Sequence, residues 1–364
     1  MHKSALPSRP IPKLETDFYI MTEQTVCVSA LQLEERVFQY LSAAGASAVS
    51  ARAATQALMH ASLMGVDSHG ARLAVHYATM LRGGRINPTP NLTLTQTSSA
   101  VTLMNADNGL GHYAGYQAME KACEQALQAG VGICSVAHST HFGAAGAYAL
   151  HAASQNMIGI ALSNSDANVA LHGSTVPFHG TNPLAAAAPV QDGLPWFFDT
   201  ATSSIPFNRV RLYRSLDKLL PPDVAATQNG QVTRNPHDAF MLLPLGGESY
   251  GFKGAGLAGL ITILSAALSG ATLDADMIPM TDTEDHKTYR NVGHFFMAIN
   301  PEKFLGANHF KHIMKTYLAS LSVCPSTTRG VPVLYPGERE WQIRGARLNQ
   351  GIILDQQTYS ALFS

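Results

Sequence analysis

Residues 131–163, VGICSVAHSTHFGAAGAYALHAASQNMIGIALS, alternate between short apolar runs and a longer amphipathic segment. The runs VGICSVA (131–137) and MIGIALS (157–163) are typical of buried strands, because each is short and almost continuously apolar. Between them, GAAGAYALHAASQ (143–155) predicts a helix. A strand, a helix and a second strand in this order indicate an α/β core with some parallel pairing.

The same alternation continues on both sides of this stretch. TSSAVTLMNAD (97–107) predicts a strand, and residues 112–129 predict a helix that Gly130 ends. The apolar side chains of that helix follow the i, i+3, i+4, i+7, i+8 rule at Met119, Ala122, Cys123, Ala126 and Leu127. PLAAAAPV (183–190) and LPWFFD (194–199) predict further strands, which would make the sheet mixed.

Residues 29–82 have a helical pattern instead. Ser29 is a candidate cap for a first helix that Gly45 ends, and Ser47 or Ser50 begins a second. A third helix is expected from about His69 to Leu81, where Gly83-Gly84 stops it. The proline-marked linker NPTPN (87–91) separates this small helical unit from the α/β region.

Composition limits the classes of partner and the compartment. The 364 residues are 46% hydrophobic and 13% charged with a net charge of −1, so no overall field attracts nucleic acid or an anionic membrane. A small soluble ligand is the default partner. Four cysteines without C-x-x-C spacing suit a reducing cytoplasm. Residues 1–25 lack an apolar h-region and are predicted to be a poorly ordered arm.

Residues 254–273 are the one segment that calls for a membrane test. GAGLAGLITILSAALSGATL is uncharged over 20 positions, about the length of a spanning helix. Its glycines, alanines and hydroxyl residues make it only mildly hydrophobic, and Lys253 is its one basic neighbour. A helix buried in the protein core is therefore predicted rather than a membrane span.

Residues 109–114 contain a G-x-G-x-x-A motif between a predicted strand and a predicted helix. A dinucleotide fingerprint also needs an acidic residue at the end of the next strand, to hold the ribose hydroxyl. That strand ends in His138 and Ser139 instead. The motif therefore predicts a tight turn with close helix packing and not a pyrophosphate site.

Polar side chains follow the strands of the α/β region. His138 and His141 follow VGICSVA, Ser165 and Asp166 follow MIGIALS, and Asp199 ends LPWFFD. The loops after parallel strands gather at one edge of a sheet, so these groups are expected to face one cavity. The two histidines have no third ligand at metal-site spacing, so no metal is predicted.

The stretch MGVDSHGAR (64–72) places four polar groups at the expected start of the third helix. With Asp67 or Ser68 as the cap, His69 would lie at the positive end of the helix dipole, which lowers its pKa. Arg72 would share its face, where it could bind a carboxylate while His69 exchanges a proton. The alternative is a plain capped helix with a surface salt bridge.

Seven ordered blocks resemble the malate/L-lactate dehydrogenase family of non-Rossmann, NAD(P)-dependent oxidoreductases. They are GVDSHGARLAVHYATMLRGGRINP, NADNGLGHYAGYQAMEKACEQALQAGVGICSVAHSTHFGAAGAYA, FHGTNPLAAAAP, FFDTATSS, GFKGAGLAGLITILSAALSGA, GHFFMAINPEKF and YPGEREWQIR. The family includes sulfolactate and ureidoglycolate dehydrogenases and reductases of cyclic imines. The resemblance covers about nine-tenths of the chain.

The resemblance implies a homodimer with a three-layer, mixed-sheet α/β domain that binds NAD or NADP at residues 91–302. A helical domain would combine residues 26–90 with about 303–364. His69, with Ser68 and Asp199, resembles the proton relay of some members, and His141 resembles the acid/base of others. Arg72 resembles the carboxylate anchor. Nucleotide contacts are implied for Ser165, Thr200, Ala201, Lys253, Gly337 and Glu338.

Residues 203–244 depart from the family pattern. Arg209 stands near the usual glycine-lysine pair, and Asn229 and Asn235 stand where acids are usual. The choice between NAD and NADP therefore stays open. The expected activity is hydride transfer to or from C2 of a small 2-oxo or 2-hydroxy acid. A cyclic 2-imino acid is the alternative substrate, and a nucleotide-binding paralogue without activity is a third possibility.

Overall fold

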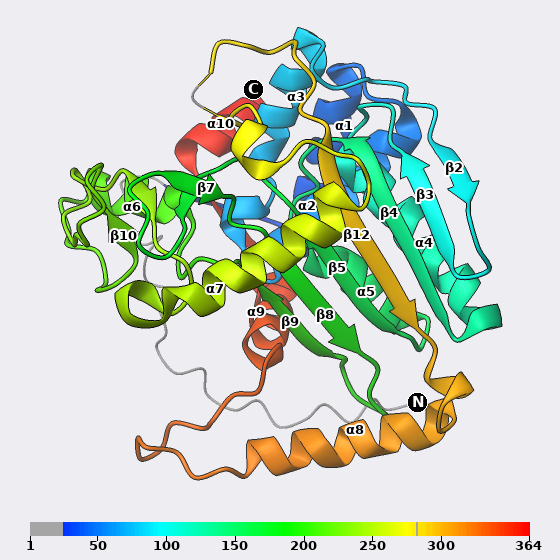
Figure 1. The fold of residues 1–364 in the computed structure, drawn as a ribbon. Helices are drawn as coiled ribbons and strands as arrows, with labels where there is room; N and C mark the ends of the chain where they lie inside the picture. Colours follow the sequence, from blue (N-terminus) through cyan, green and yellow to red (C-terminus); the bar gives the residue numbers. More distant parts are fainter. Residues whose placement is uncertain (1–24, 282) are drawn as a thin grey trace.

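A seven-stranded sheet forms the centre of the protein, in a computed structural model that describes residues 25–281 and 283–364 (Figure 1). The predicted arm at residues 1–25 therefore lies, except for Thr25, outside the described residues. In spatial order the strands are β2 (Thr93–Gln96), β3 (Val101–Asn105), β4 (Val131–Ser139), β12 (Val292–Ile299), β5 (Ile158–Ser163), β8 (Leu184–Ala188) and β9 (Trp196–Thr200).

Within this sheet only β3 and β4 pair in parallel, and the other five neighbouring pairs are antiparallel. The late strand β12 pairs with both β4 and β5, so these two strands run in the same direction without touching. This order differs from the parallel 3-2-1-4-5-6 arrangement of dinucleotide-binding folds. The predicted mixed-sheet, non-Rossmann α/β class is confirmed.

Helices cover both faces of the sheet. On one face lie α4 (Gly111–Ala129) and α5 (Gly146–Ser154), and on the other lies α7 (Gly247–Thr262), which continues through a π-helical turn at 263–267 (Figure 1). Successive residues of β12 point to opposite faces: Phe296 packs with α4 and α5, whereas Phe295 packs against the α7 side. The core is therefore divided into two layers by the sheet.

A helical unit packs against α4 through α2 and is built from both ends of the described chain. It contains α1 (Ala30–Ala43), α2 (Ala48–Leu63), α3 (Leu73–Gly83) and α10 (Gln356–Phe363), with the antiparallel pair β1 (Thr25–Val28) and β13 (Ile352–Asp355). Ser29 and Ser47 cap α1 and α2 through their side chains, as predicted. The domain boundaries near residues 90 and 303 stay a prediction.

The remaining C-terminal helices lie along the sheet domain. α8 (Ala307–Ser322) follows the 3₁₀ turn Pro301–Lys303, and its Lys311 accepts a bond from Gln191 through the backbone carbonyl. α9 (Glu338–Gln350) begins against β9, because a Cβ on Gly337 would lie 2.8 Å from the backbone oxygen of Phe197. Gly337 also has a φ of +91°, so both the turn and the close approach require glycine there.

The predicted start of the third helix is wrong. Residues Asp67–His69 form a one-turn 3₁₀ helix, and α3 begins only at Leu73, without a side-chain cap. The carboxylate of Asp67 is instead paired with Arg347, so it is not free to accept bonds from a helix start. His69 therefore precedes α3 and does not lie at its first turn.

The divergent segment 203–244 folds beside the main sheet. It supplies α6 (Phe207–Ser215), β10 (Ala225–Ala226) and β11 (Met241–Leu242) to a small lobe on the left of Figure 1. These two strands join β6 (Val169–Ala170) and β7 (Pro177–His179) in a four-stranded sheet. The departures from the family pattern thus fall in one compact unit with its own apolar cluster.

Residues 254–267 of the uncharged segment are helical, but their burial differs from the prediction. Gly247–Ala267 is long and apolar enough to cross a membrane by length and composition, and 39% of its most apolar window is buried. Ile261 packs against Leu162 and Phe295 of the sheet, whereas Leu260 and Ile263 are exposed. Only one side of the helix is therefore in the core, because the sheet covers one side alone.

Candidate active site

His69 and His141 lie side by side although they come from the 3₁₀ turn and from the loop after β4. Their ring centroids are 5.6 Å apart, and the hydroxyl of Ser68 lies 2.9 Å from Nδ1 of His69. Burial and the charge of Arg72 lower the pKa of His69 to about 4. Burial is the main cause that lowers the pKa of His141 well below its usual value, and the electrostatic effect of His69 is the second. Both imidazoles are therefore neutral at pH 7.

Nδ1 of His141 receives two contacts. The hydroxyl of Tyr77 lies 2.6 Å from it, and the backbone N–H of Gly143 donates to the same nitrogen at 3.3 Å. Tyr77 is 1% exposed, and burial raises the pKa of its hydroxyl, so the group stays protonated. Its ring also meets the buried ring of His112 edge to face at 4.7 Å. Sequence reasoning missed Tyr77, because its position fits the apolar face of α3.

The turn that carries Ser68 and His69 is fastened to two helices. Both carboxylate oxygens of Asp67 accept bonds from Arg347 of α9, at 2.5 and 2.8 Å, and Arg347 also donates to the carbonyl of Ser62 in α2. Gly70 approaches α2 so closely that an added Cβ would lie 2.3 Å from Oγ of Ser62. The glycine of the DSHG motif is thus required by close packing and not by a positive φ.

Arg72 is exposed next to the histidines. It precedes α3, so the expectation that it shares a helical face with His69 is wrong, but its charge still acts on the His69 ring. Its side chain lines a small surface depression with Asp67 and residues 353–355. Within the described parts of the chain, Arg72 makes no hydrogen bond or ion pair. Its guanidinium is therefore available to an incoming carboxylate.

A second guanidinium, that of Arg290, acts on His141 through its charge. Arg290 is 5% exposed, pairs with Asp166 and donates to the carbonyl of Ile278. Its positive charge lowers the pKa of both His141 and Tyr77, although burial is the larger effect on His141 and opposes it on Tyr77. Asp166 follows β5, so this ion pair joins the β5 loop to the segment before β12, and the shared cavity for the β4 and β5 loops stays a prediction. No sequence signal linked Arg290 to the site.

The predicted relay is only partly assembled. Asp199 at the end of β9 accepts a bond from the backbone N–H of Gly146 at 2.9 Å, and the structure records no bond from it to Ser68 or His69 among residues 25–281 and 283–364. Burial raises the pKa of Asp199 to about 6, and the charge of Glu340 adds to the effect. Asp199 is therefore a carboxylate that can change protonation near neutral pH.

The residues with implied nucleotide contacts gather around the ends of β5 and β9. Thr200 and Ala201 follow Asp199, and the Gly337-Glu338 turn packs on the same strand. Backbone N–H of Ser165 is held by Asn182, which also bonds α7, the helix that carries Lys253. Lys253 itself is exposed, with its ammonium 5.3 Å from the ring centre of Tyr250.

One observation tests whether this region suits a nicotinamide nucleotide. The hydroxyl of Ser165 and the side-chain oxygen of Asn168 are both buried, and neither has a hydrogen-bond partner in the described structure. Buried polar atoms are nearly always paired in folded proteins. These two unpaired atoms, both in the loop after β5, fit a site that a polar ligand completes.

The G-x-G-x-x-A turn is packed against protein. A Cβ on Gly111 would lie 2.2 Å from the carbonyl oxygen of Thr140, and one on Gly109 would lie 2.4 Å from Pro90. The backbone N–H of Gly111 donates to the Thr140 hydroxyl, so it is not directed at a phosphate. These contacts agree with the predicted tight turn.

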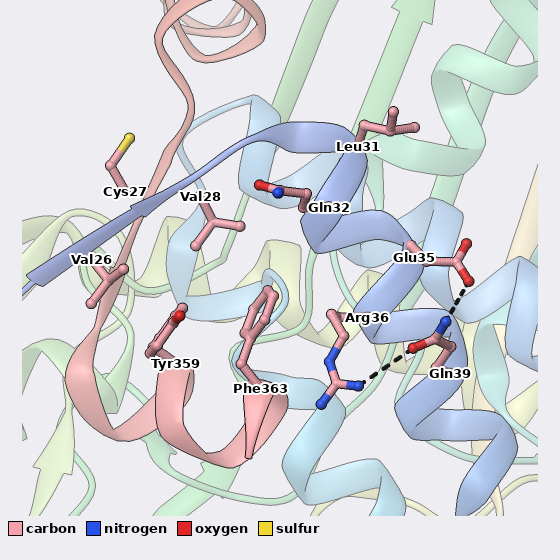
Figure 2. A pocket seen from close by; sticks show the side chains of 10 residues that line it. All are labelled: Val26, Cys27, Val28, Leu31, Gln32, Glu35, Arg36, Gln39, Tyr359 and Phe363. Carbon is pink, nitrogen blue, oxygen red and sulfur yellow. Dashed lines mark hydrogen bonds between the residues drawn. The ribbon is translucent and has the colours of Figure 1, made fainter.

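One further groove and two further histidines lie apart from this chemistry. A groove of about 700 Å³ between β1, α1 and α10 is lined by Val26, Cys27, Val28, Leu31, Gln32, Glu35, Arg36, Gln39, Tyr359 and Phe363 (Figure 2). No predicted site residue lines it. His151 pairs with Glu120 at 2.7 Å, and His138 is exposed. The described residues contain no group of three potential metal ligands.

Comparison with known proteins shows the same relationship along the whole described chain. The family model for malate/L-lactate dehydrogenase matches residues 28–363. The chain is 34% identical to a malate dehydrogenase of Pyrococcus abyssi over 91% of each sequence, and 30% identical to a ureidoglycolate dehydrogenase (NAD(+)) of Escherichia coli O157:H7 over 93% and 95%. The crystal structure of malate dehydrogenase from Entamoeba histolytica superposes with a TM-score of 0.87 at 31% identity, covering 93% of this chain and 96% of that one. The protein is therefore an oxidoreductase that belongs to the malate/L-lactate dehydrogenase family.

Proposed function

We propose that the protein transfers hydride between NAD or NADP and C2 of a small 2-hydroxy or 2-oxo acid. The observation that carries the proposal is the pair of neutral imidazoles, 5.6 Å apart, beside an exposed arginine without a protein partner. Two imidazoles can bond the oxygen on C2, and a guanidinium binds the adjacent carboxylate in two-point geometry. Dehydrogenases and a reductase among the relatives support the reaction class.

Each side chain has a definable part in this reaction. Arg72 would hold the carboxylate, and His69 and His141 would face the oxygen on C2, where the proton is exchanged. Ser68 would orient His69 through the 2.9 Å contact to Nδ1. Asp199, whose pKa of about 6 lies near neutrality, would tune the charge of the site from β9.

The nucleotide would lie against Ser165, Thr200, Ala201, Lys253 and the Gly337-Glu338 turn. When bound, it supplies or takes the hydride at nicotinamide C4. The buried and unpaired hydroxyl of Ser165 supports this placement. The preference for NAD or NADP depends on groups near the ribose. We expect residues of the divergent lobe at 203–244 to set this preference.

A cyclic 2-imino acid is the alternative substrate. It carries the same carboxylate next to C2, with nitrogen in place of oxygen, so Arg72 and the histidines would serve it equally well. A nucleotide-binding paralogue without activity is less consistent with the structure, because the imidazole pair and the free guanidinium are both intact.

We further propose a cytoplasmic homodimer. Support comes from the family resemblance and from the apolar side of α7, where Phe252, Leu260, Ile263 and Leu268 are exposed in the single chain. Light scattering coupled to size exclusion would measure the mass in solution. A single-chain mass at micromolar concentration would contradict the dimer.

Oxidation of NADH and NADPH with a panel of 2-oxo acids and cyclic imines tests the proposed reaction. Both nucleotides are needed in each assay, since the preference is open. We expect turnover with at least one acid that has a carboxylate next to the reacting carbon. Tight nucleotide binding by calorimetry without turnover of any compound would favour the paralogue instead.

A further inference from the structure

The contacts of His141 decide which of its two ring nitrogens carries the proton. A backbone N–H can only donate, so the bond from Gly143 to Nδ1 requires that Nδ1 accept. The hydroxyl of Tyr77 is 2.6 Å from the same nitrogen and must also donate, because an unprotonated nitrogen offers no hydrogen to it. In the neutral ring the proton then lies on Nε2.

The surroundings of the ring oppose a second proton. Tyr77 is buried and protonated, and the charged or titratable groups that act on His141 are His69, His112, Arg290 and His76. These neighbours are cationic when charged and otherwise neutral. An imidazolium at His141 would gain no carboxylate partner and would lose its bond from Gly143.

The hydrogen bonds of His69 leave its tautomer open. Its Nδ1 is 2.9 Å from the hydroxyl of Ser68, which can either donate or accept, because the hydroxyl rotates. With the proton on Nδ1, Nε2 of His69 is a free base. With protons on both nitrogens, His69 is an acid that retains its bond to Ser68. The two adjacent imidazoles are therefore chemically different.

We propose that Tyr77 and the backbone of Gly143 hold His141 as the neutral Nε2–H tautomer, so that His141 is a fixed hydrogen-bond donor while His69 exchanges the proton. The catalytic half of this inference rests on the proposed function. Tyr77 acts through His141 and is a positioning residue. Sequence alone does not distinguish the two histidines, whereas their hydrogen bonds do.

Electrons and protons balance when hydride transfer runs in either direction. In reduction, hydride brings two electrons to C2, and Nε2–H of His141 bonds the C2 oxygen as negative charge develops. The proton moves to that oxygen from Nε2 of His69, which first takes it from solvent, because His69 is neutral at pH 7 in the free protein. In oxidation, neutral His69 takes the hydroxyl proton as hydride leaves C2. His141 ends each direction in the tautomer in which it began.

Nitrogen-15 NMR of histidine-labelled, full-length protein tests the tautomer without turnover. The shifts of the two ring nitrogens show which one is protonated, and the His141→Gln spectrum assigns the signal. We expect the proton on Nε2 of His141, and we expect Tyr77→Phe to shift the Nδ1 resonance because it removes one of two donors. Tyr116→Phe, another buried tyrosine substitution, is the matched control and should leave it unchanged. A proton on Nδ1 in the wild-type protein would overturn the proposal.

Kinetics with the acid that the substrate panel identifies test the division of roles. A glutamine side chain can donate but cannot titrate, so His141→Gln should lose about tenfold in kcat and keep the pH profile, as expected for one weakened hydrogen bond. His69→Gln should lose at least about a hundredfold and flatten the profile. Tyr77→Phe should lower kcat about tenfold with little change in KM.

A His141→Gln enzyme with a flattened profile would overturn the assignment of roles, and so would a Tyr77→Phe enzyme with unchanged kcat. If no acid is turned over at all, the proposed function fails while the NMR result still decides the tautomer. The two failures are therefore distinguishable.

Discussion

The ion pair between Asp67 and Arg347 should stabilise the fold and position the His69 turn. Arg347 lies on α9, far along the chain, and binds both carboxylate oxygens as well as the carbonyl of Ser62. Removing either side chain leaves the other without its partner in a partly buried location. We therefore predict a strong coupling between Asp67→Ala and Arg347→Ala.

The expected magnitude follows from the burial of the pair. The two side chains are 17% and 20% exposed. Breaking a fully buried pair costs about 3–5 kcal/mol, and an exposed pair contributes about 0–1 kcal/mol. An intermediate cost of about 2–3 kcal/mol for each single substitution, and a coupling energy of about 2 kcal/mol, fit two-point geometry at this burial.

Urea unfolding of the wild-type protein, both single variants and the double variant measures the coupling energy. The surface pair Lys121–Glu124, at 3.1 Å with a glutamate that is 58% exposed, is the control and should couple by less than about 0.5 kcal/mol. A coupling for Asp67 and Arg347 no larger than the control would refute the reasoning. Asp67→Ala should also lower kcat, since His69 loses its anchored turn.

Three other outcomes are expected. Arg72→Ala should raise KM for the acid at least about tenfold with a small effect on kcat, because it removes uniform carboxylate binding; an unchanged KM would contradict the anchor role, and Arg52→Ala is the control. Gly70→Ala should destabilise the fold by about 1–3 kcal/mol in urea unfolding through its clash with Ser62, whereas Gly256→Ala, which meets nothing within 4 Å, should not destabilise it. The free energy of unfolding should fall as pH drops from 6.5 toward 4. In the folded protein the pKa is about 4 for His60, His69 and His76 and about 3 for His112 and His294. The unfolded chain therefore binds more protons than the folded one in that range. Asp199, with its raised pKa, acts in the opposite direction but is one group against these five histidines and His141, whose pKa is also lowered. A urea midpoint that is constant between pH 7 and 5 would contradict this expectation.

The local pattern of the sequence predicted α1 to α5, α7 and five strands of the central sheet. The caps at Ser29 and Ser47 and the strand runs at 131–137 and 157–163 depend on neighbouring residues, which are visible in the chain itself. The start of the third helix failed for a related reason. Asp67 has the composition of a cap, but a distant arginine binds its carboxylate.

The family resemblance identified His69, His141, Arg72 and Asp199 as candidates, and their individual roles remain predictions. It could not show that His69 and His141 differ, because that difference depends on Tyr77 and on a backbone N–H. The resemblance also did not indicate Arg290, which lies in the loop before β12 and whose charge acts on His141.

The sequence by itself determined the α/β class and the helix caps at Ser29 and Ser47, because periodicity and side-chain type are local properties. Only the tertiary structure decided that β12 inserts between β4 and β5, that Arg347 holds the His69 turn, and that Tyr77 meets His141. A periodic pattern shows which face of an element is apolar but not which distant element will cover it. That choice depends on the summed packing and hydrogen bonding of segments far apart in the chain.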